Sequence, residues 1–244
     1  MAQSAEILRQ RDSQILTRRA AQVQRGGARA AVLGVNDGLV STLCIVLGVA
    51  AAGADQSAVL LAGLAGLIAG SISMAAGEWI SVQSQVDLFE GVLKDLKSML
   101  KNDKKLLEDN LTAHLVDDGY EAKTAAKATT ELAKDKNRFF NTYSTQVIGL
   151  NPDELGSPWV AAGSSFVLFT LGALAPLSPW FFSSGGSAMI SSIVLTAIGG
   201  LIAGGYVAYS SGKPKVLGAF RQFFIVLLAS AVTYGVGVFF GTVV

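Results

Sequence analysis

Two acidic side chains lie inside strongly apolar stretches, where a charge needs a specific reason. Asp37 is the only charged residue of the stretch 30–52, and Glu78 interrupts the apolar part of the stretch 60–90. A charge at the middle of a membrane costs about 2.5 to 3.5 kcal/mol on insertion scales, so such residues usually face a bundle interior or a pathway. We therefore predict that both carboxylates line an ion path.

Met74 lies one helical turn before Glu78, so a thioether and a carboxylate share one helix face. This pair suits a transition-metal ion better than calcium or magnesium. At about 1.5 Å per helical residue, Asp37 and Glu78 both lie roughly 10 Å deep from the same side of the membrane. Asp37, Met74 and Glu78 are thus predicted to bind one divalent metal ion.

The two carboxylates also suggest how transport could be coupled. In a low-dielectric cleft they repel each other, so the pair should hold either a cation or a proton, and competition between the two offers a coupling mechanism. The alternative is structural. Both acids would then hydrogen-bond to backbone, Ser or Asn groups and fix helix packing, while Met74 would fill a gap in the core.

Glycines accompany these residues along both stretches. Gly66 and Gly70 share the face of Met74 and Glu78, with Gly77 beside them, and Gly34 and Gly38 flank Asp37. Small residues let helices approach each other closely within a membrane. We expect these five glycines to be helix-packing positions.

The two stretches belong to a set of five that can cross a bilayer. The chain is 51% hydrophobic and 15% charged, with a mean hydropathy of +0.47, which is typical of a polytopic membrane protein. About 20 helical residues span the hydrocarbon, and the stretches that qualify are 30–52, 60–86, 159–177, 189–209 and 220–244. We predict an all-α polytopic membrane protein with five transmembrane helices. The second helix should project beyond the membrane, because the chain continues into charged sequence after Gln85 with neither Pro nor Gly before Gly91.

Residues 87–156 are predicted to form a helical cytoplasmic domain inserted between the second and third spans. Apolar residues recur there at helical spacing among Lys and Asp. Asp118 with Glu121 matches a capping box and predicts a helix start, and a further short helix is expected over 136–147. An amphipathic, cationic helix is expected over 1–29, either on an anionic membrane surface or packed on the protein itself. The expected domains are 1–29, 30–86, 87–156 and 157–244.

The distribution of cations predicts the orientation. Lys and Arg lie before the first span, between Lys94 and Arg138, and after the fourth span, whereas the turns 53–57 and 177–187 have none. By the positive-inside rule, the N-terminus and residues 87–156 are cytoplasmic and the C-terminus lies on the far side.

Other classes of function are disfavoured by composition. A single Cys and a single His exclude a disulfide framework and a Cys/His zinc site. They also cannot supply a nucleophile, a base and an orienting group, so we expect neither an enzyme nor a prosthetic group. The cations follow topology instead of one basic face, which argues against a nucleic-acid partner.

Three segments resemble one known family: GVNDGLVSTLCIVLGVA (34–50), AGSISMAAGEWISVQSQVDLFE (69–90) and GLNPDELGSPWVAAGSSFVLFTLGALAPLSP (149–179). They are similar to the vacuolar iron transporter family, and the similarity covers all five spans in order. The resemblance implies a homodimer with the ion path between subunits, lined by the first and second helices. It also implies export of ferrous iron, often with manganese, from the cytoplasm in exchange for protons. The intramembrane ligands of the family correspond to Asp37, Met74 and Glu78, and the membrane is a bacterial plasma membrane or a vacuolar-type membrane.

The sequence departs from this family in two places. Some eukaryotic members have a further Glu two turns before the Met, where this chain has Gly66. Their cytoplasmic helices also bind metal through Glu-rich spacings. Here lysines stand among the acids and would repel a divalent ion. The acids that can still make weak contacts are Glu90, Asp103, Glu108 and Asp109. We expect this domain to be mainly a structural or dimerising element.

Two alternative functions remain open at this point. A metal-permeable channel can share its ligands with a transporter, and a dependence of flux on an opposing proton gradient would separate the two. A non-transporting membrane scaffold or regulator of the same fold is the other alternative, although Asp37 and Glu78 are both intact and argue against it.

Overall fold

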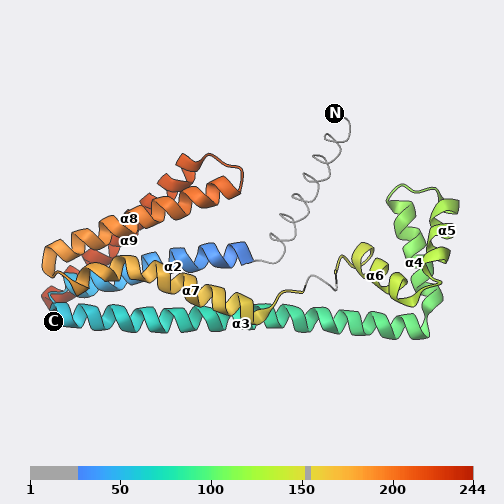
Figure 1. Ribbon diagram of the computed structural model, residues 1–244, viewed down its shortest axis with the longest axis horizontal. Coiled ribbons are helices and arrows are strands. Elements are labelled where there is room, and N and C mark those ends of the chain that lie inside the picture. Colours follow the sequence, from blue (N-terminus) through green and yellow to red (C-terminus); the bar gives the residue numbers. More distant parts are fainter. Residues whose placement is uncertain (1–26, 152–154, 244) are drawn as a thin grey trace, which may run out of the picture. The chain divides into compact units, whose positions relative to one another are not determined.

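A computed structural model describes residues 27–151 and 155–243, and this part of the chain is all-helical (Figure 1). The expected all-α fold is therefore confirmed. The N-terminal amphipathic helix expected over 1–29 lies almost entirely outside the described residues. The helices are α2 (Gly27–Ala51), α3 (Gln56–Asn102), α4 (Lys104–Asp117), α5 (Ala122–Leu132), α6 (Lys136–Gln146), α7 (Pro158–Leu177), the 3₁₀ helix η2 (Ser178–Phe181), α8 (Gly185–Ser210) and α9 (Lys215–Val243).

Five of these helices, α2, α3, α7, α8 and α9, are long and apolar enough to cross a membrane, as the apolar stretches predicted. The chain divides into two compact units. We call residues 27–80 with 158–243 the spanning unit, and residues 81–157 the inserted unit. Helix α3 runs without interruption for 47 residues and contributes to both units, which confirms that no helix break follows Gln85.

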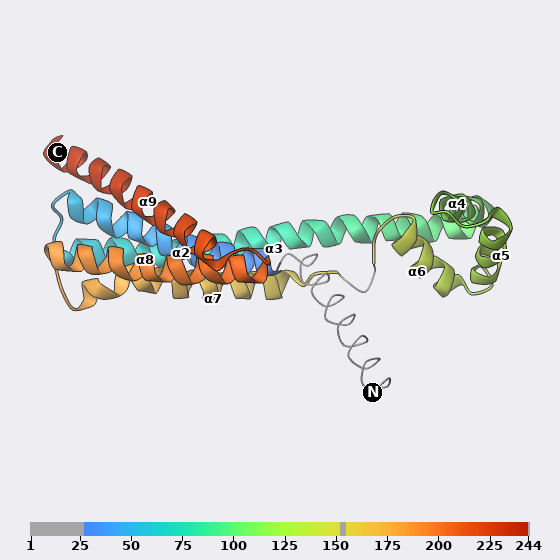
Figure 2. The ribbon, with the colours of Figure 1, turned by 90° about the horizontal axis from the view of Figure 1, so that it is seen from above.

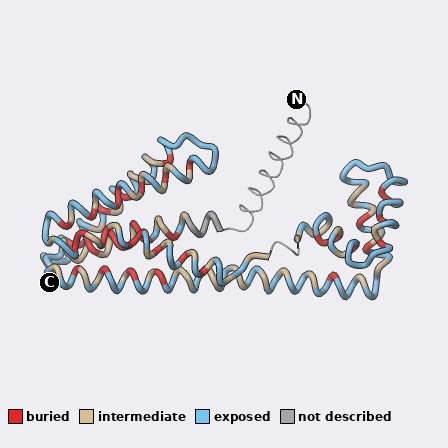
Figure 3. Tube along the Cα trace, in the orientation of Figure 1, coloured by how far each residue is buried: buried red, intermediate tan, exposed pale blue. Residues whose placement is uncertain are grey.

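Within the spanning unit, α2 packs against α7, α8 and α9, and Figure 2 shows it between α9 and α7. These helices approach closely enough that backbones touch. A Cβ added at Gly38 would lie 2.2 Å from the carbonyl oxygen of Phe169 in α7, and one at Gly237 of α9 would lie 2.4 Å from that of Gly48. Helix α2 is accordingly the most enclosed span (Figure 3). In its most apolar stretch 39% of the residues are buried, against 17% for α3 and for α9.

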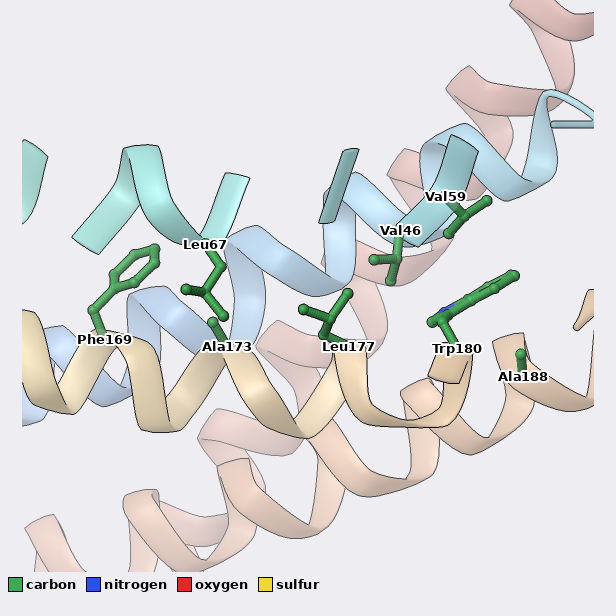
Figure 4. Close-up of a cluster of buried hydrophobic side chains, with 8 residues drawn as sticks. All are labelled: Val46, Val59, Leu67, Phe169, Ala173, Leu177, Trp180 and Ala188. Carbon is green, nitrogen blue, oxygen red and sulfur yellow. The ribbon is translucent and has the colours of Figure 1, made fainter. Parts of the chain in front are cut away.

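Residues of α2, α3, α7, η2 and α8 meet in an apolar cluster (Figure 4). Its members are Val46, Val59, Leu67, Phe169, Ala173, Leu177, Trp180 and Ala188. The Trp180 indole N–H donates to the Ser192 hydroxyl at 3.0 Å, which donates to the Pro176 carbonyl at 2.7 Å. These two hydrogen bonds give partners to the buried polar groups where α7 ends, and such groups are costly when they have no partner.

The inserted unit has its own core of larger side chains. Leu96 of α3 packs with Leu107 and Leu111 of α4 and with Phe139 and Tyr143 of α6. The short helix expected over 136–147 is confirmed as α6, which Asp135 caps by accepting from the N–H groups of Asn137 and Arg138.

The predicted capping box at Asp118 and Glu121 is wrong. Asp118 ends α4, because its N–H bonds to the His114 carbonyl, and Gly119 then takes a φ of +97° that turns the chain. Helix α5 begins only at Ala122, and the Glu121 side chain makes no capping hydrogen bond.

Candidate metal site

Asp37 lies on the outward face of α2. The preceding residue, Asn36, accepts a hydrogen bond from the Gln222 amide of α9, and the following residue, Gly38, packs on α7. Successive residues of a helix point about 100° apart. Asp37 therefore points about 100° away from each of these two contacts, towards the outside of the helix bundle. Its side chain is accordingly exposed.

The surroundings of Asp37 are otherwise apolar. Leu33, one turn before it, is 49% exposed, and Ser41, one turn after it, donates its hydroxyl to the Asp37 backbone carbonyl. Among the residues that the structure describes, no Lys, Arg or His forms an ion pair with Asp37 or Glu78. The Asp37 carboxylate thus lies on an exposed helix surface without a countercharge among the residues that the structure describes.

Met74 and Glu78 lie on one face of α3. Leu67 and Ser71, which precede them on the same side of the helix, are buried. Met74 is partly buried and packs against the apolar cluster that contains Phe169, and Glu78 is partly buried one turn further on. The thioether and the carboxylate therefore share one face, as their spacing predicts.

Phe169 of α7 lies between Gly38 of α2 and Gly70 of α3. Figure 4 shows the Phe169 ring reaching from α7 towards α3. A Cβ at Gly38 would meet the Phe169 backbone, and a Cβ at Gly70 would lie 2.2 Å from the Phe169 ring. Helices α2 and α3 approach each other closer to their connection, where a Cβ at Gly66 would lie 2.4 Å from Ile45.

The five predicted packing glycines have different surroundings. Gly34 and Gly38 lie against α7, Gly66 against Ile45, and Gly70 against Phe169, whereas a Cβ at Gly77 would meet nothing within 4 Å. Among the described residues, Gly77 therefore leaves an open face on α3 beside Glu78.

Two features near the site were not anticipated from sequence. The amide pair Asn36–Gln222 links α2 to α9 beside Asp37, and a polar Gln within an apolar span was the signal that could have found it. Trp79, next to Glu78, contacts the Trp159 ring of α7 at a centroid distance of 5.7 Å. These contacts fix the two helices that carry the acids.

The acids of the inserted unit are dispersed. Glu108 pairs with Lys104 at 3.4 Å and Asp109 with Lys105 at 3.2 Å, while Glu90 and Asp103 are exposed. No group of three or more His, Cys, Asp or Glu that could hold a metal occurs in the described part of the chain. Two of the four candidate acids are thus engaged by lysines.

Comparison with known proteins gives a consistent picture. Residues 28–238 match the VIT family. The chain is 33% identical to the vacuolar iron transporter of Acanthamoeba castellanii over 218 residues, which cover 87% of this chain and 78% of that protein. It is 32% identical to vacuolar iron transporter homolog 2 of Arabidopsis thaliana over 208 residues, 85% and 81% of the two chains. Vacuolar iron transporter 1 of Tulipa gesneriana is 28% identical over 207 residues, 84% of each chain.

Proposed function

Because the chain belongs to the VIT family of transporters, we propose that it moves ferrous iron, and manganese as well, out of the cytoplasm in exchange for protons. Asp37, Met74 and Glu78 form the ion site in this proposal. The names of the relatives supply iron as the substrate. The donor set supplies the rest of the argument, because carboxylate and thioether ligands suit a divalent transition metal and carboxylates also bind protons.

The observation that carries the proposal is the outward position of Asp37. A charge that faces lipid is costly, about 2.5 to 3.5 kcal/mol at mid-membrane on insertion scales. The described residues of the same chain offer Asp37 no cation to pair with. A second copy of the chain placed over this face would enclose the carboxylate. We therefore place the ion path between the two subunits of a homodimer.

Protons and metal then compete for the same oxygens. Metal binds when Asp37 and Glu78 are ionised, and protonation from the opposite side releases it. Met74 adds a soft ligand that favours ferrous or manganous ion over calcium and magnesium. The N-terminus and residues 87–156 lie on the cytoplasmic side in this scheme, because the cations gather there.

Flux into liposomes tests the site. The purified protein is reconstituted, and uptake of Fe²⁺, Mn²⁺ and Ca²⁺ is measured with and without a pH gradient. Asp37→Asn and Glu78→Gln keep volume and hydrogen bonding but lose the charge, so metal flux should fall to the level of empty liposomes. Parental flux in both folded variants would show that the acids are structural, and flux that ignores the pH gradient would identify a channel.

Cross-linking tests the position of the path. Cys44 is the only cysteine of the chain, so a Cys44→Ala background leaves one reactive thiol when Leu33→Cys is added. Leu33 shares the exposed face of Asp37, and a short bis-maleimide should join two subunits there. Ile190→Cys, on an exposed position of α8, serves as the matched control. Equal cross-linking at both positions would contradict a subunit interface at Asp37.

A further inference from the structure

Helices α2, α7 and α8 enclose an apolar groove that the transport proposal does not use. Its volume is about 410 Å³, and its lining includes Val35 and Leu39 of α2, Leu171 and Gly172 of α7, and Ile202 and Tyr206 of α8. The floor is narrow because small residues stand there. A Cβ at Gly172 would lie 2.3 Å from the Val35 carbonyl oxygen, and one at Gly199 would lie 2.9 Å from Leu39.

The groove has an open rim. Leu171 is 58% exposed, Ile202 68% and Tyr206 67%. All three helices that form the walls are long and apolar enough to span a membrane, so this rim faces hydrocarbon. Water does not occupy an apolar cavity favourably, and a peptide segment would bring backbone groups that find no partner there. A hydrocarbon chain fills such a groove without leaving any polar group unpaired.

A positive charge lies about one helical turn beyond the groove residue Tyr206. Tyr206 carries the polar side chain of the groove lining, and Tyr209 follows it one turn later on α8. The Lys215 ammonium lies 4.3 Å from the centre of the Tyr209 ring. No Asp or Glu occurs in the sequence from residue 155 to 244, and no described carboxylate forms an ion pair with Lys215.

We propose that this groove binds one acyl chain of an anionic phospholipid, taken from the leaflet next to the α8–α9 connection. The acyl chain lies along Leu39, Gly199 and Ile202. The phosphate accepts a hydrogen bond from the Tyr206 hydroxyl and pairs with Lys215, as basic residues at the membrane surface pair with anionic headgroups. The lipid supports the contact of α8 with α2, and this role is independent of which metal is transported.

Native mass spectrometry of the full-length protein tests the proposal. The protein is purified in mild detergent and offered phosphatidylglycerol or phosphatidylcholine of identical acyl chains. The wild type should retain phosphatidylglycerol in preference to phosphatidylcholine. Lys215→Gln should lower that preference about fivefold, as expected for one basic group near an anionic headgroup. Lys127→Gln, exposed on α5, is the control for loss of a charge elsewhere.

A second pair of variants tests the groove itself. Ala203→Phe fills the groove and should abolish retention of both lipids, whereas Ala231→Phe, on an exposed position of α9 outside the groove, should not. If Ala203→Phe does not elute as folded protein, Leu171→Trp at the exposed rim replaces it. Equal retention of the two lipids, or unchanged retention in the groove variant, overturns the proposal. A change of oligomeric state in the groove variant also overturns it, because the groove would then be a subunit interface.

Discussion

The spanning unit and the inserted unit are both all-helical, yet different contacts hold them together. In the spanning unit, helices meet through glycines that let backbones touch, as at Gly38 with α7 and at Gly204 with the Gly218 carbonyl, 2.4 Å from the position of an added Cβ. In the inserted unit, helices meet through large side chains such as Phe139 and Leu111. Polar contacts add to these, including the Lys104 ammonium, which donates to the Ala133 carbonyl at 2.7 Å.

This difference follows from the two solvents. Lipid tails are as apolar as Leu, so membrane helices gain little from burying apolar side chains and depend on close packing instead. In water, removing apolar surface from the solvent drives folding. The same chain therefore uses glycine contacts in one unit and a side-chain core in the other. The predictions that follow address this contrast, in order of decreasing expected effect.

Phe139→Ala should have the largest effect on stability. Phe139 is fully buried in the core of the inserted unit, and replacing a buried Phe by Ala costs about 3 to 5 kcal/mol. Limited proteolysis should then cut within 81–157 while the spanning unit stays resistant. Leu106→Ala, on a largely exposed position of α4, is the control. Equal loss of protection in both units would show that they do not fold independently.

Gly38→Ala should destabilise the spanning unit. The added methyl group meets the Phe169 backbone, which cannot move aside as a side chain can, and overpacking of this kind costs about 1 to 3 kcal/mol. Gly77→Ala is the matched control, because nothing lies within 4 Å of its Cβ and Ala favours a helix over Gly by about 1 kcal/mol. The midpoint of thermal unfolding in detergent should fall for the first variant and not for the second. A similar fall in both would point to a contact at Gly77 from another subunit.

Asp135→Ala should have a smaller effect. The Asp135 side chain caps α6, and losing an N-cap acceptor costs about 1 kcal/mol. Asp118→Ala removes an acid that caps no helix N-terminus and should change the free energy of unfolding by less than about 0.5 kcal/mol. Urea unfolding followed by circular dichroism compares the two variants. An equal loss of free energy of unfolding in both variants would show that Asp118 caps a helix, as the sequence predicted.

Asp55 should give the smallest effect, seen only as a dependence on pH. The Ala58 N–H and the Ser57 hydroxyl each donate to its carboxylate at 2.8 Å, and these bonds, that of Ala58 first, lower the pKa of Asp55 below its ordinary value of 3.8. A carboxyl group with a lowered pKa stabilises the folded state above its unfolded pKa, and this contribution disappears as the pH falls through the folded pKa. The gap in thermal midpoint between the wild type and Asp55→Asn should therefore narrow below about pH 4. A constant gap would argue against the two hydrogen bonds.

The sequence predicted the number and order of the spanning helices, because the length of an apolar stretch shows whether it can cross a membrane. The match to the VIT family confirms the resemblance. Helix bounds were less accurate. Helix α9 begins at Lys215 instead of Phe220, and α8 at Gly185 instead of Met189. Hydropathy marks the hydrocarbon, whereas a helix continues until its backbone hydrogen bonds end.

The surroundings of the candidate site could be predicted only in part. The spacing of Met74 and Glu78 predicted that they share one helix face, because that depends only on residues close together in the sequence. The position of Asp37 relative to them depends on which helices are neighbours. Helix α2 packs chiefly on α7, and Phe169 of α7 separates Gly38 from Gly70. Adjacency along the chain did not reveal this contact between distant segments.

The hydrogen bonds that join Trp180, Ser192 and Pro176 bear on how the chain enters the membrane. Ser192 and Pro176 are only 16 residues apart, so a short loop closes them at low entropic cost. Each polar group left unpaired in hydrocarbon costs several kcal/mol. These two hydrogen bonds pair three such groups within α7, η2 and α8 alone. During biosynthesis, α7 and α8 can therefore enter the membrane as one hairpin, with these polar groups already paired before α9 is synthesised.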